Sequence, residues 1–358
     1  MMKKCMFTIL FGLCTLLLFA EYPSVVFGAG IKPFMSSETL LPSEILLATV
    51  VDARLSMRSL LGDIGYFSLL AGGNAGFLFD SATYFLDEEV VSCEAGFNIG
   101  DSRIVLQGGI ESSLQGTLVD NPFFEPNWQL KYTFSTKRDE LQPYVSAAGN
   151  WRMHSADNED VFFLGAETGF QYSPDALTEY TLRLGGGWEN WYEYYLYNFG
   201  GGYSIQTRQD FVGAASAKIS SLFDFFLQWE LECEALLRIS DANRYITALL
   251  FYEEMSENNI NVIMTATGNF SVNKYVNIKL VPAVGVQYYF MRQALAAGSV
   301  LLDENVYVIH AGGLVHFDWT SNNSIYFIIE LEGSRDFSND AESDQWMLKG
   351  YIGIKGML

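Results

Sequence analysis

A period-two alternation of side chains, recurring from residue 65 to the end of the sequence, constrains the fold of this chain more than any other feature. In residues 127–135, for example, every second position is large and apolar: Trp128, Leu130, Tyr132 and Phe134. Successive side chains of a β-strand point to opposite faces, so each such segment has one apolar and one polar face. No stretch after residue 30 reaches the roughly 18 consecutive apolar residues that a membrane-spanning helix needs. The apolar surface is therefore dispersed over strands.

The number and length of these segments predict a transmembrane β-barrel. Many run twelve residues or more, which is longer than a usual soluble strand and sufficient for a tilted membrane strand of about 9 to 11 residues. We count sixteen segments, near residues 65–80, 89–100, 102–118, 127–137, 142–153, 160–173, 178–191, 194–207, 211–220, 222–239, 244–255, 260–272, 275–291, 304–319, 324–336 and 344–358.

The connections between the segments alternate between tight and long, as the periplasmic turns and outer loops of outer-membrane barrels do. Turn-forming residues mark tight connections at 100–102, 137–139, 174–175, 209–210, 241–243, 273–274 and 321–323. No long loop is visible near Glu193 or near Ser221, so fourteen strands is the alternative count. The fold class predicted is an all-β, antiparallel up-and-down barrel of about sixteen strands over residues 65–358.

The N-terminus is typical of an exported protein. Lys3 and Lys4 precede an apolar stretch from Met6 to Ala20, the order found in a secretory signal peptide. The small residues around Gly28 predict a signal peptide over residues 1–28, and cleavage after Ala20 is the alternative. The net charge of -21 makes nucleic acid an implausible partner.

Residues 29–62 are predicted to form a periplasmic or plug segment before the barrel. Residues 43–61 have apolar positions at helical spacing, with Ser43 as a candidate N-cap and Gly62 as a stop. A period-two pattern also fits this stretch. Sixteen later strands already bring both barrel ends to the periplasmic side, which favours the helix.

Residues 65–358 resemble the bacterial outer-membrane β-barrel superfamily, which includes porins and related channels. The last strand carries the alternating apolar residues expected at the C-terminus of such barrels, although these usually end in Phe or Trp: Leu348, Ile352, Ile354 and Leu358. The resemblance implies insertion by the barrel-assembly machinery into outer-membrane lipid. An N-terminal segment before a barrel is also similar to the long-chain fatty-acid transporter family, but the Asn-Pro-Ala stretch common in that family's plug is absent.

Two glycine triplets suggest a local feature of the wall. In a hairpin register whose partner numbers sum to 387, Gly185, Gly186 and Gly187 would face Gly202, Gly201 and Gly200. Such a patch without side chains could contact a plug or could simply ease the curvature of the sheet.

The sequence offers no constellation for catalysis, a metal or a cofactor. His310 and His316 share a predicted strand, but positions six apart lie about 20 Å from each other along it. Neither a Gly-rich phosphate loop nor a paired-cysteine motif is present. We therefore predict no enzyme activity and no cofactor.

The predicted lumen carries charges of both signs. The candidates for ion selectivity are Glu94, Glu111, Lys131, Glu167, Arg183, Glu230, Glu232, Glu234, Glu330 and Glu332. Rows of carboxylates favour cations in a pore, whereas paired charges would brace a narrow barrel, and the sequence leaves both interpretations open.

We therefore hypothesise an outer-membrane channel or facilitated transporter for small solutes, weakly cation-selective. One alternative is a plugged barrel that moves hydrophobic molecules. Another is a surface barrel without transport, whose acidic outer loops bind host or matrix molecules. These loops, whose carboxylate clusters could also bind divalent cations, contain Asp87, Glu88, Glu89, Asp157, Glu159, Asp160, Glu253, Glu254, Glu257, Asp340, Glu342 and Asp344.

Overall fold

The structure of the chain is a computed structural model that describes most of the sequence after residue 23. The described residues are 24–36, 46–78, 83–113, 123–137, 140–154, 160–197, 203–224, 227–241, 244–246, 251–253, 257–296, 300–320, 325–340 and 343–357. Within these ranges there is no helix that is long and apolar enough to cross a membrane.

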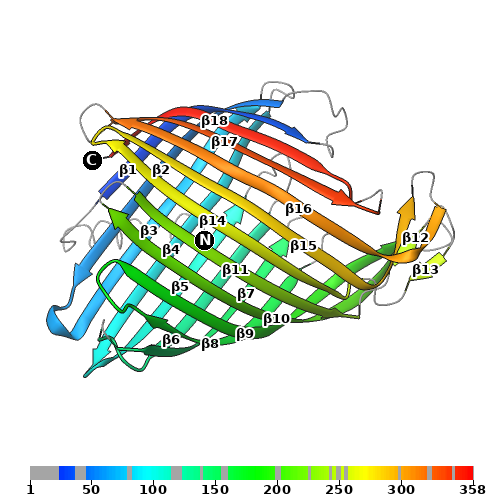
Figure 1. Cartoon of the computed structure of the whole chain (residues 1–358), viewed down its shortest axis with the longest axis horizontal. Helices are drawn as coiled ribbons and strands as arrows, with labels where there is room; N and C mark the ends of the chain where they lie inside the picture. Colours follow the sequence, from blue (N-terminus) through cyan, green and yellow to red (C-terminus); the bar gives the residue numbers. More distant parts are fainter. Residues whose placement is uncertain are drawn as a thin grey trace, which may run out of the picture.

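The described strands form a closed antiparallel barrel in which each strand pairs with its neighbours in the chain, and β1 closes the ring against β18 (Figure 1). Its strands are β1 (Ser24–Ser36), β2 (Leu46–Leu60), β3 (Gly65–Leu78), β4 (Thr83–Ile99), β5 (Ser102–Ser113), β6 (Phe123–Thr133), β7 (Gln142–His154), β8 (Val161–Tyr172), β9 (Thr178–Tyr197), β10 (Tyr203–Asp224), β11 (Leu227–Ser240), β14 (Asn259–Asn273), β15 (Val276–Ala296), β16 (Val300–Thr320), β17 (Ile325–Ser338) and β18 (Trp346–Met357). The prediction of a sixteen-stranded barrel is confirmed.

The prediction of an N-terminal helix is wrong, because residues 46–60 form strand β2 of the wall. β2 pairs along its length with β3 and also with β1, which in turn pairs with β18. The period-two pattern of this stretch therefore prevails over its helical spacing, since the pairing satisfies its backbone groups on both sides. Residues 24–36 and 46–60 are part of the barrel and not of a plug.

Two of the sixteen predicted segments are not barrel strands of their own, and β1 and β2 take their places in the count. Predicted segment 194–207 contains the end of β9 and the start of β10, and the predicted turn at 209–210 lies inside β10. Predicted segment 244–255 contains the short strands β12 (Arg244–Ile246) and β13 (Phe251–Glu253), which pair only with each other. The range after residue 65 thus supplies fourteen barrel strands, the alternative count.

The two ends of the barrel differ in their connections. The end that contains both Ser24 and Met357 has short turns, which we call the short-turn end, and the opposite end has most of the longer connections. Gly100 adopts a left-handed φ of 60° in the turn between β4 and β5, where glycine has no steric penalty. In the turn before β9, the backbone amides of Leu177 and Thr178 donate hydrogen bonds to the Asp175 carboxylate. These two hydrogen bonds hold the pKa of Asp175 below its ordinary value.

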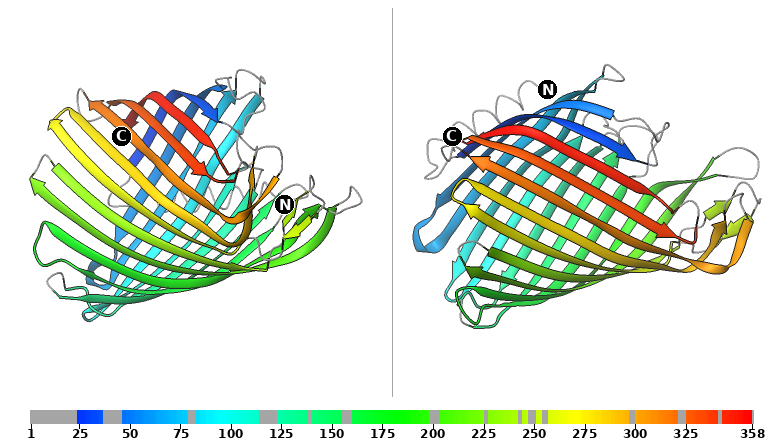
Figure 2. Two further views of the ribbon diagram at one scale, coloured as in Figure 1. Left: turned by 45° about the vertical axis from the view of Figure 1, so that its right-hand side comes forward. Right: turned by 45° about the horizontal axis from the view of Figure 1, so that its top comes forward.

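The hairpins β9–β10 and β15–β16 are longer than their neighbours and extend beyond them at the long-connection end (Figure 2). Each of these strands has 20 to 22 residues, about twice what a tilted strand needs to cross a membrane. The additional residues therefore extend the barrel wall beyond the length that a membrane crossing requires. The β12–β13 hairpin lies at the same end.

Candidate functional site

Most barrel strands have one face that is apolar and exposed. The pairing places these residues on a common face of the sheet: Val51, Val91, Phe97, Leu106, Trp128, Leu130, Val145, Leu164, Leu182, Leu184, Phe211, Leu231, Leu237, Val262, Met264, Val284, Val286, Ile309, Val315, Phe327, Ile329, Leu348, Ile352 and Ile354. Water-soluble monomers rarely expose so large a continuous apolar surface. This face is therefore suited to contact the hydrocarbon of a lipid bilayer.

The opposite face carries the charged side chains and lines the lumen. Ion pairs join second-neighbour strands across this face, as between Arg183 on β9 and Glu232 on β11 or between Arg238 on β11 and Glu189 on β9. Side chains converge in this way on the concave side of a curved sheet. The charged face is therefore inside and the apolar face outside.

A closed barrel satisfies every strand's backbone groups and leaves no edge, which is the condition for crossing a bilayer with strands. Apolar residues outside and polar residues inside are the arrangement found in outer-membrane barrels. The chain is a transmembrane β-barrel of the outer-membrane type. The predicted fold class is thereby confirmed, and the lumen is its candidate functional site.

All ten predicted selectivity residues lie on the lumen face. Most of them have partners there. Lys218 contacts Glu230 at 2.7 Å, Arg183 pairs with Glu232, and Lys349 contacts Glu332 at 3.3 Å. The predicted rows of carboxylates therefore lie beside cations, so much of their negative charge is paired.

A second group of these residues is organised by tyrosines. Tyr144 donates a hydrogen bond of 2.6 Å to Glu167, and the Lys131 ammonium lies 4.0 Å from the centre of its ring. Tyr66 donates to Glu94. Glu111 and Glu234 also face the lumen, but neither forms an ion pair with a residue in the described ranges.

Sequence reasoning missed several charged lumen residues. Asp52, Arg54 and Arg58 lie on the lumen face of β2, which was predicted as a helix. Arg208 and Asp210 lie on the lumen face of β10, where a turn was predicted. In both places the sequence alternates between apolar and polar residues as a strand does. The first stretch was nevertheless predicted as a helix and the second as a turn.

Asp210 is the centre of a buried network near the long-connection end. Its carboxylate is fully buried and accepts hydrogen bonds from Arg208 and Arg238, each at 2.7 Å, and from the Ser240 hydroxyl. The Arg208 guanidinium also lies 4.9 Å from the ring centre of Trp191. The network joins β9, β10 and β11 at the base of the extended hairpin.

A second buried carboxylate fixes an outer connection. Asp340, in the connection between β17 and β18, is fully buried and accepts a 2.9 Å hydrogen bond from Arg292 of β15. Asp344 pairs with Arg335 at 2.6 Å. Two of the acidic residues predicted to lie in outer loops thus serve local structure, and no metal-binding group of three or more ligands occurs in the part of the chain that the structure describes.

The predicted glycine register is wrong. Gly185, Gly186 and Gly187 pair with Ala214, Gly213 and Val212 of β10, because β9 and β10 run on to Tyr197 and Tyr203. Gly200, Gly201 and Gly202 lie outside the described residues. The wall is continuous here, and the Phe163 ring fills the space where a side chain of Gly165 or Gly187 would lie.

The two histidines of β16 lie on the lumen face, each beside a carboxylate on β17. His310 Nδ1 is 2.6 Å from Asp336, and His316 Nδ1 is 2.7 Å from Glu330. His316 Nε2 also lies 3.4 Å from Asp318. Both ring nitrogens of His316 therefore contact carboxylates, an arrangement that braces the wall.

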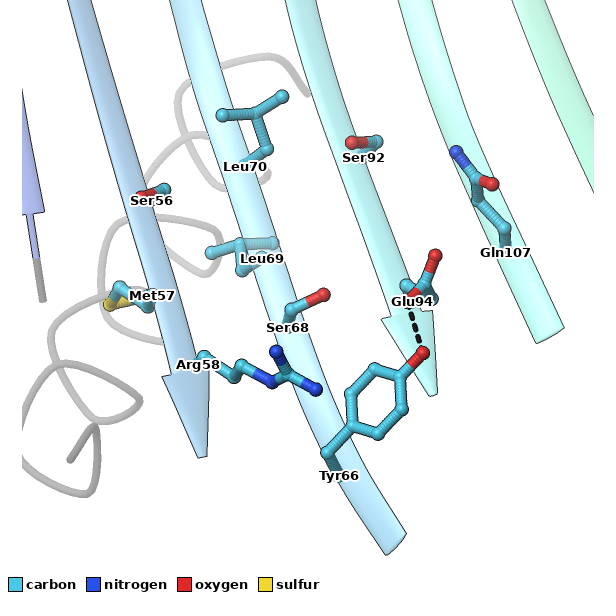
Figure 3. Close-up of a pocket in the computed structure, with 10 residues that line it drawn as sticks. All are labelled: Ser56, Met57, Arg58, Tyr66, Ser68, Leu69, Leu70, Ser92, Glu94 and Gln107. Carbon is cyan, nitrogen blue, oxygen red and sulfur yellow. Dashed lines mark hydrogen bonds between the residues drawn. The ribbon is translucent and has the colours of Figure 1, made fainter. Parts of the chain in front are cut away.

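Two cavities are set into the lumen wall. One of about 430 Å³ lies toward the short-turn end between β2 and β5, and its polar lining includes Arg58, Tyr66 and Glu94 (Figure 3). The other, of about 230 Å³, lies toward the long-connection end and is lined by Val212, Leu236, Arg238, Glu257, Asn259, Asn261, Gln287 and Tyr289. Both cavities are concave and are lined by polar and apolar residues together.

Comparisons with known proteins give no family for this chain: no family model and no curated protein sequence matches it. Solved structures similar to it include OmpT, an outer membrane protein of Vibrio cholerae, in its trimer form, with 10% identity, a TM-score of 0.47 and coverage of 94% of this chain and 100% of that chain. The outer membrane channel DcaP of Acinetobacter baumannii has 10% identity, a TM-score of 0.48 and coverage of 94% and 96%. At these values the similarity is one of general barrel architecture, and the fold assignment rests on the strand pairing of this chain.

Proposed function

We propose that this protein is an outer-membrane channel for small hydrophilic solutes, with a weak preference for cations. The observation that carries the proposal is a closed sixteen-stranded barrel whose inner face is charged. Barrels of 16 to 18 strands enclose an aqueous channel, whereas barrels of about eight strands are filled by their own side chains. Charged residues on the lumen wall also remain hydrated in such a channel and thereby avoid the penalty of burial.

The balance of lumen charges supports a weak preference rather than a strong one. The lumen-facing carboxylates are those of Asp52, Glu94, Glu111, Glu125, Glu167, Glu179, Glu189, Asp210, Glu230, Glu232, Glu234, Asp318, Glu330, Glu332 and Asp336. The lumen-facing cations are those of Arg54, Arg58, Arg103, Lys131, Arg152, Arg183, Arg208, Lys218, Arg238, Lys279, Lys349 and Lys355. Among these described residues the carboxylates are only slightly in excess, and many are paired.

Neutralising the carboxylate row of β11 tests this selectivity. The variant Glu230→Gln/Glu232→Gln/Glu234→Gln removes three negative charges from one stretch of wall, so the ratio of potassium to chloride permeability should fall to one or below. The measurement is the reversal potential of the pore in a salt gradient.

The opposite change provides a matched control. Lys218→Gln/Arg183→Gln removes the cations that contact the same row, and the permeability ratio for potassium should then rise. Unchanged reversal potentials in both variants would remove this part of the wall from the selectivity mechanism.

The alternative of a plugged barrel for hydrophobic molecules loses the segment on which it rested. The residues predicted as the plug form β1 and β2 in the wall, and the glycines predicted to face each other do not. The alternative of a surface barrel with binding loops rests on twelve acidic residues, of which Asp157, Glu159, Glu254 and Glu342 lie outside the described ranges. Asp87, Glu88 and Glu89 lie within strand β4 and not in a loop as predicted. The lumen geometry favours neither.

The position of β1 bears on the maturation of the chain. Cleavage after Gly28 would remove Ser24–Gly28 from β1, including the positions that pair with Lys355, Gly356 and Met357 of β18. Cleavage after Ala20 leaves the whole strand intact. We therefore propose that the mature chain begins at Glu21, which the mass of the protein purified from outer membranes would show. A mature N-terminus at Ala29 would contradict this.

A further inference from the structure

The larger of the two cavities contains polar side chains that form no hydrogen bond with another described residue. It is lined by Ser56, Met57, Arg58, Tyr66, Ser68, Leu69, Leu70, Ser92, Glu94 and Gln107. Figure 3 shows the hydroxyls of Ser68 and Ser92 and the amide of Gln107 on neighbouring strands around the Tyr66–Glu94 hydrogen bond. No hydrogen bond is recorded for these three side chains within the described ranges. They are available to a ligand.

Arg58 is the cation of this cavity, and among the described residues no carboxylate forms an ion pair with it. Its guanidinium carbon lies 4.4 Å from the ring centre of Tyr66, while the phenol of that tyrosine donates to Glu94. Stacking on an aromatic face fixes the guanidinium plane and leaves its N–H edges free. A planar guanidinium with free edges is suited to bidentate binding of a carboxylate.

The charges around Arg58 favour an anion in this part of the wall. Arg54 precedes Arg58 on the same face of β2, and Arg103 lies on the lumen face of β5 toward the same end of the barrel. Glu94 lines the same cavity and accepts the hydrogen bond of the Tyr66 phenol, and Asp52 lies further from Arg58 along β2. On the lumen face of β2, the two described arginines outnumber the single described carboxylate, Asp52.

We propose that this cavity is a binding subsite for a small hydroxylated carboxylate, such as a sugar acid, at the short-turn end of the lumen. The ligand's carboxylate binds the N–H edges of Arg58. Its hydroxyls exchange hydrogen bonds with Ser68, Ser92 and Gln107 and donate to the Glu94 oxygen that Tyr66 does not use. A cavity of about 430 Å³ has the volume typical of sites for small molecules. The inference rests on the proposed function and assigns a solute class to the same lumen.

The cavity's composition separates this class from two others. A neutral sugar would leave the Arg58 guanidinium without a partner, and a simple carboxylate such as acetate would leave the serine hydroxyls and the glutamine amide unused. A zwitterionic amino acid would use Arg58 and Glu94 but few of the neutral groups. The hydroxylated carboxylate uses all of them.

Equilibrium binding to the detergent-purified full chain tests the proposal without requiring transport. Saturation-transfer NMR with galacturonate, galactose, acetate and serine should show saturable binding of galacturonate that is tighter than that of the other three. Arg58→Gln should weaken galacturonate binding at least about tenfold, because it removes a charge-assisted bidentate contact. Arg54→Gln, which makes the same charge change on the same face of β2 outside the cavity lining, removes no direct contact and should weaken binding much less than Arg58→Gln does.

Ser92→Ala adds a variant that keeps every charge, and it should weaken galacturonate binding but not acetate binding. Equal loss in Arg54→Gln and Arg58→Gln would overturn the subsite, because binding would then follow lumen charge in general. Equal or tighter binding of galactose or serine would overturn the solute class. Single-channel recordings distinguish the two proposals: galacturonate binding to a protein that carries no current would support the subsite and contradict the channel, and ion current without galacturonate binding would do the reverse.

Discussion

A chain that lacks residues 29–62 is expected to form no closed barrel and to yield no channel activity. The deletion removes most of β1 and all of β2, the two strands that join β18 to β3. The remaining edges of β3 and β18 would then expose unpaired backbone groups to lipid, each at a penalty of several kcal/mol. Heat-modifiable gel mobility and protease resistance of the outer-membrane fraction would measure the loss.

A second deletion serves as the control for this experiment. Removing residues 244–253 takes away β12 and β13, which pair only with each other, so the barrel should still assemble. If the 29–62 deletion instead gave a folded barrel with a larger conductance, the segment would act as a plug and its assignment to the wall would be contradicted.

Replacement of Asp210 by alanine is expected to destabilise the folded barrel by about 3 to 5 kcal/mol, the range found when one partner of a buried ion pair is removed. Asp210 is fully buried and accepts hydrogen bonds from Arg208 and Arg238. Without it the buried Arg208 would lose this counter-charge, whereas the partly exposed Arg238 would keep Glu189 at 3.3 Å. The measurement is the midpoint of reversible urea unfolding in lipid vesicles.

The exposed ion pair of a short turn provides the contrast. Asp101 lies 3.0 Å from the Lys137 ammonium, and both side chains are at least half exposed. Asp101→Ala should therefore change the stability by no more than about 1 kcal/mol. The double variant Asp210→Ala/Arg208→Ala should recover part of the loss seen in Asp210→Ala, because it also removes the buried cation that Asp210 neutralises. Equal effects of Asp101→Ala and Asp210→Ala would show that the buried network contributes nothing beyond a surface contact.

The alternation of apolar and polar residues was sufficient to predict the barrel and the face of each candidate residue. All ten selectivity candidates lie on the lumen side, because a strand has only two faces and lipid selects the apolar one. Turn-forming residues were a less reliable guide to the positions of the connections. Gln209 and Asp210 have the composition of a turn, but the lumen provides arginines that allow the aspartate to lie within a strand.

The pairing of charges could not be predicted from one sequence. Glu230 and Glu232 form a row on β11, but their partners Lys218 and Arg183 lie on β10 and β9, and the registers that bring them together depend on the length of each hairpin. The same dependence explains the glycine error, since extending β9 to Tyr197 moves every partner of Gly185–Gly187 by twelve positions along β10. Arg58 and the cavity were missed because β2 was assigned to a helix.

The most direct test of the account is the current through the purified full-length protein in a planar lipid bilayer. An open sixteen-stranded lumen predicts discrete, stable conductance steps that grow in proportion to salt concentration, with a small reversal potential of cation-selective sign in a salt gradient. A folded protein that inserts into the bilayer and carries no current over the same salt range would contradict the channel.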